Sequence, residues 1–208
     1  MFKGRKFDIR AFMVVLCSKP WFVLAHTGYA RVCLPEFKMK NFGKKQVQES
    51  TGKLTPTTQR MIHETSLSVQ RKHPDFLERK QETTITLDKL KAQLIEEGKT
   101  TDLHFKERVT DRMLEAMRLV FLQIKDRLDA RYGCFEIFGV DFLVSEEDDL
   151  CPKLMEITSC PSFSLEMADS KPIIRTLVRD TITMAQELHE KNRDRAREEH
   201  MARVIKCA

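Results

Sequence analysis

Two acidic residues stand inside apolar segments in the second half of this 208-residue chain. Asp141 lies in FGVDFLV and Glu156 in KLMEITS, and the acidic stretch 146–149 separates the two segments. Two apolar runs around a polar turn predict a β-hairpin, in which antiparallel pairing sets Asp141 opposite Glu156. Because directly opposed like charges on one sheet face destabilise each other, we expect a positive group between them.

A metal ion is the positive group that this pair of carboxylates suits best. Burial in an apolar strand raises the pKa of a carboxyl unless a cation stabilises the charged form. Hard oxygen ligands fit Mg²⁺, which binds one or two carboxylates and completes its shell with water and substrate phosphates. Thr158 shares a strand face with Glu156, so its hydroxyl is a third candidate ligand. The pattern predicts a magnesium and nucleotide site, but an exposed sheet face with two ordinary acids fits it equally well.

A strand near the start of the chain carries a second set of charges. Lys6, Asp8 and Arg10 alternate with apolar residues, which sets three charges on one strand face. Such a row fits a solvated face as well as a binding site. Further strands are expected on either side of a turn at residues 26–28.

Helical periodicity appears in three places after a polar stretch, 38–60, that we expect to be a mobile surface loop. A short helix is predicted over 87–97, and a long helix over 109–128 is capped by Thr101 or Thr110. A third helix begins near residue 171 and continues into a charged segment. The helices are expected on one side of an antiparallel sheet, so the predicted fold class is α+β.

The composition restricts the class of protein. Lys and Arg total 36 against 31 Asp and Glu, a net charge of +5 that suits an acidic partner without requiring one. The six cysteines show no paired spacing typical of zinc sites and are expected to be reduced thiols. No secretory signal begins the chain, and its apolar runs are too short to cross a bilayer. We therefore expect a monomeric, cytoplasmic protein that binds neither nucleic acid nor membranes.

The two apolar segments that contain Asp141 and Glu156 also resemble a known family. FGVDF followed by KLMEITSCPSF is similar to the end of the catalytic domain of the tubulin tyrosine ligase-like family. KFDIR at 6–10 and GYAR at 28–31 match earlier motifs of that family in the same order. A further motif is matched in part at 61–72, with Ser66 where the family usually has Asn.

The resemblance implies a fold and a division of the chain. The family consists of ATP-grasp ligases, so the expected fold is α+β, an ATP-grasp-like antiparallel sheet with packed helices. This chain corresponds to the C-terminal portion of that domain and looks truncated before it. Residues 1–190 are expected to be the partial catalytic domain, and residues 191–208 a charged helical tail.

The resemblance also implies ATP and Mg²⁺ as cofactors and a role for each matched residue. Arg10 and Arg31 are the expected catalytic residues, because arginines neutralise charge that develops on a transferred phosphoryl group. The expected nucleotide-binding residues are Lys6, Asp8, Arg10, His63, Thr65, Ser66 and Met155. The expected metal ligands are Asp141, Glu156 and Thr158.

The activity implied by the resemblance is the ATP-dependent addition of an amino acid to tubulin through an acyl phosphate. The motif spacing is closest to the polyglycylase-like branch, which favours glycine over glutamate. The partners would be the acidic tails of tubulin or microtubules and a free amino acid. The location would be the cytoskeleton, with the cilium or flagellum included.

Two other interpretations stay open from the sequence. Thr158 stands where the family has Asn, and Ser66 and Glu64 also depart from its pattern. These changes favour a catalytically impaired pseudoligase that binds microtubules. An ATP-binding fragment without an independent function is the remaining alternative.

Overall fold

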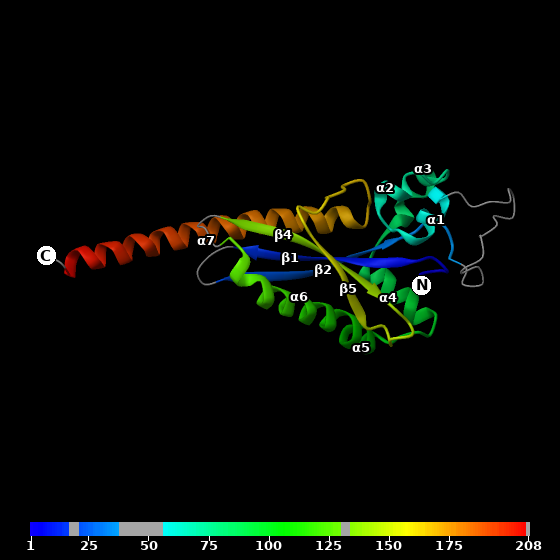
Figure 1. Cartoon of the computed structure of the whole chain (residues 1–208), viewed down its shortest axis with the longest axis horizontal. Coiled ribbons are helices and arrows are strands. Elements are labelled where there is room, and N and C mark those ends of the chain that lie inside the picture. The colour runs from blue at the N-terminus through cyan, green and yellow to red at the C-terminus, as the bar shows by residue number, and fades with distance from the viewer. Residues whose placement is uncertain (17–20, 38–55, 130–133, 207–208) are drawn as a thin grey trace.

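The computed structural model describes residues 1–16, 21–37, 56–129 and 134–206. These residues form a five-stranded antiparallel sheet with helices packed on both faces (Figure 1). The predicted α+β class is confirmed. The expected packing on one side was wrong, because the last helix of the chain covers the second face of the sheet.

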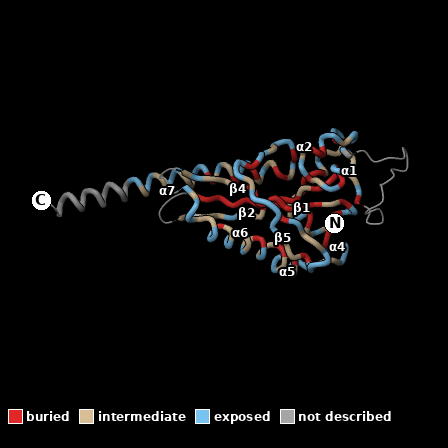
Figure 2. The backbone as a smooth tube through the Cα atoms, viewed as in Figure 1, coloured by how far each residue is buried: buried red, intermediate tan, exposed pale blue. Residues whose placement is uncertain are grey.

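The central strand of the sheet is β1. The strand order is β3-β2-β1-β4-β5, and every neighbouring pair is antiparallel. The strands are β1 Phe7–Leu16, β2 Phe22–Val32, β3 Thr84–Thr86, β4 Phe135–Val144 and β5 Pro152–Ser159. All ten residues of β1 are buried, which Figure 2 shows as a continuous red strand.

Seven α-helices surround this sheet in the described part of the chain. They are α1 Pro56–His63, α2 Leu67–Gln70, α3 Phe76–Arg79, α4 Leu87–Glu96, α5 Asp102–Phe105, α6 Asp111–Ile124 and α7 Ser170–Lys206. Helices α4, α5 and α6 cover one face, α7 runs along the other and extends beyond the sheet, and α1–α3 gather at one end (Figure 1).

The two-residue period of β1 explains how one strand serves two hydrophobic cores. Ile9 and Met13 point to one face and pack with the apolar sides of α4–α6. Phe12 and Val14 point to the other face and pack with α7. An apolar run buried on both faces is therefore required at this position, and the sequence from Ala11 to Leu16 supplies it.

Helix boundaries agree with the capping signals in the sequence, with one correction. Thr86 accepts a hydrogen bond from the Lys89 amide at 3.2 Å and caps α4. Thr101 caps α5 in the same way, with a 3.1 Å bond from the amide of His104. The long helix predicted from residue 109 therefore begins earlier, because α5 continues through a π-helical turn into α6. Thr110 lies inside this run and makes no cap.

The predicted β-hairpin is confirmed together with its register. Asp141 pairs with Glu156, and Gly139 pairs with Thr158. A β-bulge follows Asp141, because Phe142 pairs with Leu154 and so skips one residue of β5. The side chains of Asp141 and Glu156 thus lie on the same sheet face as expected.

The turn expected at residues 26–28 was wrong, because β2 is one strand that contains a bulge. The register against β1 shifts where Tyr29 pairs with Arg10 but His26 pairs with Phe12. Gly28 has φ +73°, and a Cβ there would lie 1.7 Å from the carbonyl oxygen of Arg10. The glycine that suggested a turn therefore permits a close approach between two strands.

The expected loop at 38–60 is corrected at its end. Residues 38–55 lie outside the described residues, but α1 already begins at Pro56. Proline fits the first position of a helix because it needs no hydrogen-bond partner for its nitrogen there.

Candidate functional site

Four charged side chains form a continuous ion-pair network on the sheet face that α7 shares. Arg10 donates from Nη2 to Asp141 at 2.9 Å, and its Nε also donates to that carboxylate. Arg31 donates from Nε and Nη2 to Asp8 at 2.8 Å and 2.7 Å. The same Nη2 of Arg31 donates to Asp141 at 2.7 Å. The two bidentate pairs are therefore joined into one unit.

Strand register explains why these four residues meet. Asp8 of β1 pairs with Arg31 of β2, and Arg10 of β1 pairs with Asp141 of β4. Opposite charges thus face each other across both neighbouring strands. Gly139 makes room for this arrangement, because a Cβ at that position would lie 3.2 Å from Nη1 of Arg10.

The network lies largely out of contact with solvent, which strengthens its electrostatics. Burial alone would raise the pKa of Asp141, but the hydrogen bonds from Arg10 and the charge of Arg31 outweigh it and lower that pKa. Burial would lower the pKa of Arg31, whereas its bonds to Asp8 raise it further above its usual value. Both shifts favour the charged forms of Asp141 and Arg31. We expected a metal ion between Asp141 and Glu156, and the positive groups that the structure places against Asp141 are these two arginines.

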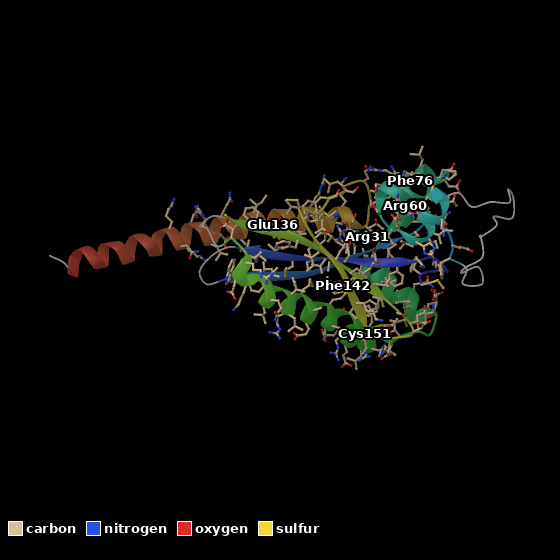
Figure 3. The ribbon with its side chains drawn as sticks, viewed as in Figure 1. Arg31, Arg60, Phe76, Glu136, Phe142 and Cys151 are labelled. Carbon is tan, nitrogen blue, oxygen red and sulfur yellow. The ribbon has the colours of Figure 1, made fainter. Side chains whose placement is uncertain are left out.

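A cavity of about 570 Å³ opens above the network. In Figure 3, Arg31 lies on the same side of the sheet as the cavity, whereas Phe142 lies on the side of α4–α6. Six of the residues expected at the site line the cavity: Arg10, Arg31, Thr65, Ser66, Glu156 and Thr158. Asp8 and Asp141 are absent from its lining and contact the arginines instead. Thr65 links its wall to the network, because its hydroxyl donates to Asp8 at 2.6 Å.

The expected metal ligands differ in what they can offer. Glu156 is exposed and makes no ion pair with any described residue, so its carboxylate is available. Thr158 is half-buried beside it on β5 and presents a neutral hydroxyl oxygen. Asp141 accepts three N–H bonds on its two oxygens, which together have about four lone-pair positions. Glu156 is therefore the expected ligand with the most to offer, while little of Asp141 is left to share, and the described residues contain no group of three His, Cys, Asp or Glu side chains placed to hold a metal ion.

Four of the expected nucleotide-binding residues lie outside the cavity lining, namely Asp8, which contacts Arg31, and Lys6, His63 and Met155. Nζ of Lys6 lies 2.9 Å from Nδ1 of His63 and 4.3 Å from the ring centroid of Phe37. Burial lowers the pKa of Lys6, and burial together with the charge of Lys6 lowers that of His63. Met155 is the residue skipped at the bulge of β5, and it is 59% exposed. Lys6 and His63 thus contact each other outside the cavity lining, and Met155 lies separately on β5.

Sequence reasoning missed part of the cavity wall. Tyr29 lies next to the network on β2, and burial raises the pKa of its hydroxyl. Arg71 and the segment 162–167 complete the wall. Arg71 lies within the partly matched motif at 61–72, and Ser162 lies within the matched end CPSF, so membership of these motifs was an available signal.

The sequence profile of the tubulin-tyrosine ligase family matches residues 1–194. The protein polyglycylase TTLL10 of Macaca fascicularis is 26% identical over 194 residues, which cover 91% of this chain and 28% of that protein. The inactive polyglycylase TTLL10 of Homo sapiens is 26% identical, and the match covers 91% of this chain and 26% of that protein. The probable tubulin polyglutamylase TTLL9 of Rattus norvegicus is 24% identical, and the match covers 86% of this chain and 34% of that protein.

The α+β sheet and its polar cavity define a protein of the ATP-grasp-like type, in which a sheet face carries a cluster of charged residues. The profile match extends over nearly the whole chain, and the chain therefore belongs to the tubulin-tyrosine ligase family. It spans about a quarter to a third of the length of these relatives. The described helices include none with the length and apolarity needed to cross a membrane.

Proposed function

We propose that this chain forms part of an ATP-dependent ligase that adds an amino acid to tubulin. The main support is the cavity above the Arg10–Asp141 and Arg31–Asp8 pairs. It is lined by two arginines that these ion pairs fix in position and by the carboxylate of Glu156, which makes no ion pair with a described residue. Such a surface is suited to a polyphosphate and a divalent cation. Membership of the family supports the same class of reaction.

The arginines would act on charge that develops at the transferred phosphoryl group. Arg10 and Arg31 both line the cavity, and their bidentate bonds to buried carboxylates fix their direction before any ligand arrives. Preorganised donors of this kind need no reorganisation at the moment of reaction. Ser66 adds a hydroxyl group at the cavity wall for a phosphate or ribose oxygen, whereas the hydroxyl of Thr65 donates to Asp8 and can only accept from a ligand.

Glu156 and Thr158 would hold Mg²⁺, with a minor share for Asp141. When bound, Mg²⁺-ATP supplies the phosphoryl group that activates a carboxylate as an acyl phosphate, which an amine then attacks. Lys6, Asp8, His63 and Met155 remain proposed nucleotide contacts. Asp8 would act indirectly, since it positions Arg31 and lies behind the cavity surface.

Glycine is the proposed amino acid, with glutamate as the alternative. Relatives named as polyglycylases match 91% of this chain, and the probable tubulin polyglutamylase TTLL9 of Rattus norvegicus matches 86% at similar identity. The acceptor would be the acidic tails of tubulin or microtubules, and the location would be the cytoskeleton, including the cilium or flagellum. A monomer and a division near residue 190, within α7, are also proposed.

A catalytically impaired pseudoligase is the second candidate, and two observations favour it. Asp141 is engaged by two arginines, so a bound metal would depend on Glu156 and on the short side chain of Thr158. One relative of equal similarity is named an inactive polyglycylase.

Incorporation of labelled glycine or glutamate into tubulin by the full-length product of this gene tests the proposal. We expect ATP- and Mg²⁺-dependent incorporation, with glycine preferred. Thr158→Asn separates the two candidates, because it restores a longer amide oxygen beside Glu156. A gain of about tenfold or more would identify Thr158 as the impairing residue, since misplacement of about 1 Å can cost on the order of a hundredfold in rate. Absence of incorporation in both proteins would exclude the ligase.

A further inference from the structure

The cavity wall holds a third arginine, Arg71, whose partner is solvent-exposed. Its Nη2 donates to Oε1 of Glu166 at 2.5 Å, and both side chains are 49% exposed. Both residues line the cavity. Arg10 and Arg31, by contrast, are paired with buried carboxylates.

We propose that Arg71 binds a carboxylate group of the substrate and that Glu166 occupies this position until the substrate replaces it. This inference rests on the proposed function for the identity of the substrate. A guanidinium offers a planar fork that matches a carboxylate, and Glu166 already demonstrates that a carboxylate fits beside Arg71.

Displacement of Glu166 would be easy. Ion pairs between half-exposed side chains contribute little to stability, since solvent screens them and both side chains lose rotamer freedom. The backbone of this segment is held separately: Gln81 donates to the carbonyl of Glu166 at 3.2 Å and accepts from the amide of Ala168 at 2.8 Å. The carboxylate of Glu166 can therefore leave without movement of the wall.

Arg71 itself stands on a rigid base. It follows the last residue of α2, and its amide donates to the carbonyl of Leu67 at 2.9 Å. The adjacent Gln70 is fully buried and bonds to the backbone of Leu34, Met61 and Glu64. Because the main chain is held while the guanidinium is half-exposed, Arg71 is positioned to exchange one carboxylate for another.

Two sources could supply the carboxylate, namely an acidic peptide or the free amino acid. Binding should be measured on the full-length protein by fluorescence anisotropy with a labelled octaglutamate peptide, and by calorimetry with free glycine and free glutamate. For Arg71→Ala we expect Kd to rise about tenfold for one of these ligands, because charge-assisted bonds to a carboxylate are lost. Glu166→Gln should change Kd for the same ligand in the opposite direction, by about two- to fivefold, since the competing charge is removed.

Arg118→Ala is the matched control. Arg118 pairs with Glu115 on α6, is similarly exposed, and lies outside the cavity lining. Its removal takes one positive charge from the surface and should leave every Kd within about twofold.

The two variants distinguish substrate binding by Arg71 from a purely structural Arg71–Glu166 ion pair. If Arg71→Ala changes no Kd, or if Glu166→Gln weakens binding as Arg71→Ala does, the inference is wrong. A higher Kd of Arg71→Ala for the peptide alone means that Arg71 binds the acidic peptide substrate. A higher Kd for the free amino acid alone means that Arg71 binds the amino acid to be added. Because the readout is binding, failure of the ligase assay would reject the proposed function without deciding this point.

Discussion

Arg31 of β2 reaches past the central strand and donates a 2.7 Å hydrogen bond to Asp141 of β4. The two strands are not neighbours, so the contact couples two hairpins of the sheet through one guanidinium. Asp141 thereby acts as a structural centre as well as a proposed metal ligand.

Asp141→Asn should destabilise the fold. The substitution keeps the shape of the side chain but leaves Arg10 without a counter-charge and Arg31 with Asp8 alone, in a largely buried position. Breaking one partner of a buried pair costs about 3–5 kcal/mol. Urea unfolding followed by circular dichroism measures this loss. A midpoint equal to that of the unsubstituted protein would show that the network contributes nothing to stability.

Glu156→Gln should separate metal binding from folding. Its carboxylate is exposed and has no ion-pair partner among the described residues, so stability should change by less than about 0.5 kcal/mol. Mg²⁺-dependent ATP turnover, or ATP binding if turnover is absent, should fall by roughly a hundredfold. Glu115→Gln on α6 serves as a control that should alter neither quantity. Equal turnover in the two variants would remove Glu156 from the site.

Gly28→Ala should be much more costly than Gly98→Ala. Both glycines have positive φ, +73° and +68°, so both substitutions carry a left-handed backbone penalty of about 1–2 kcal/mol. At Gly28 the new methyl group also meets the carbonyl oxygen of Arg10, whereas at Gly98 it meets nothing within 4 Å. The difference between their unfolding free energies isolates the close approach of β1 and β2. Equal losses would mean that the bulge relaxes freely.

His26 should make stability depend on pH. Its Nδ1 accepts the amide hydrogen of Gly28 at 2.8 Å, and partial desolvation of the ring, in a residue that is exposed overall, lowers its pKa below the ordinary value of 6.5. The folded state therefore favours the neutral ring. Its contribution is present in full above pH 6.5 and is lost as the pH falls through the lowered folded-state pKa.

His26→Asn tests this dependence, because an Asn oxygen can accept the same amide two residues on without titrating. Thermal midpoints between pH 7.5 and pH 5 should fall less steeply for the variant than for the unsubstituted protein. A residual slope is expected from His63 and His73, whose pKa values are also lowered by burial. Parallel curves for the two proteins would contradict the assignment to His26.

The pattern of residues along the chain was sufficient for the local elements. Period-two alternation predicted β1 and the hairpin, and reflection about the acidic turn predicted that Asp141 pairs with Glu156. Helical periodicity and Gly98 located α4 at Leu87–Glu96. These features depend on neighbours within one or two elements, so their signals lie close together in the sequence.

The partners of the charged residues depended on the tertiary structure. Alternation showed that Asp8 and Arg10 share a face, but not that Arg31 and Asp141 arrive from strands on opposite sides of β1. Gly28 read as a turn, because a glycine signals a positive φ without showing which backbone approaches it. Residues distant in sequence meet in the ion pairs across the sheet, at the bulge beside the Arg10 carbonyl and in the pair of Arg71 with Glu166. Only the folded chain decides which of these residues come together.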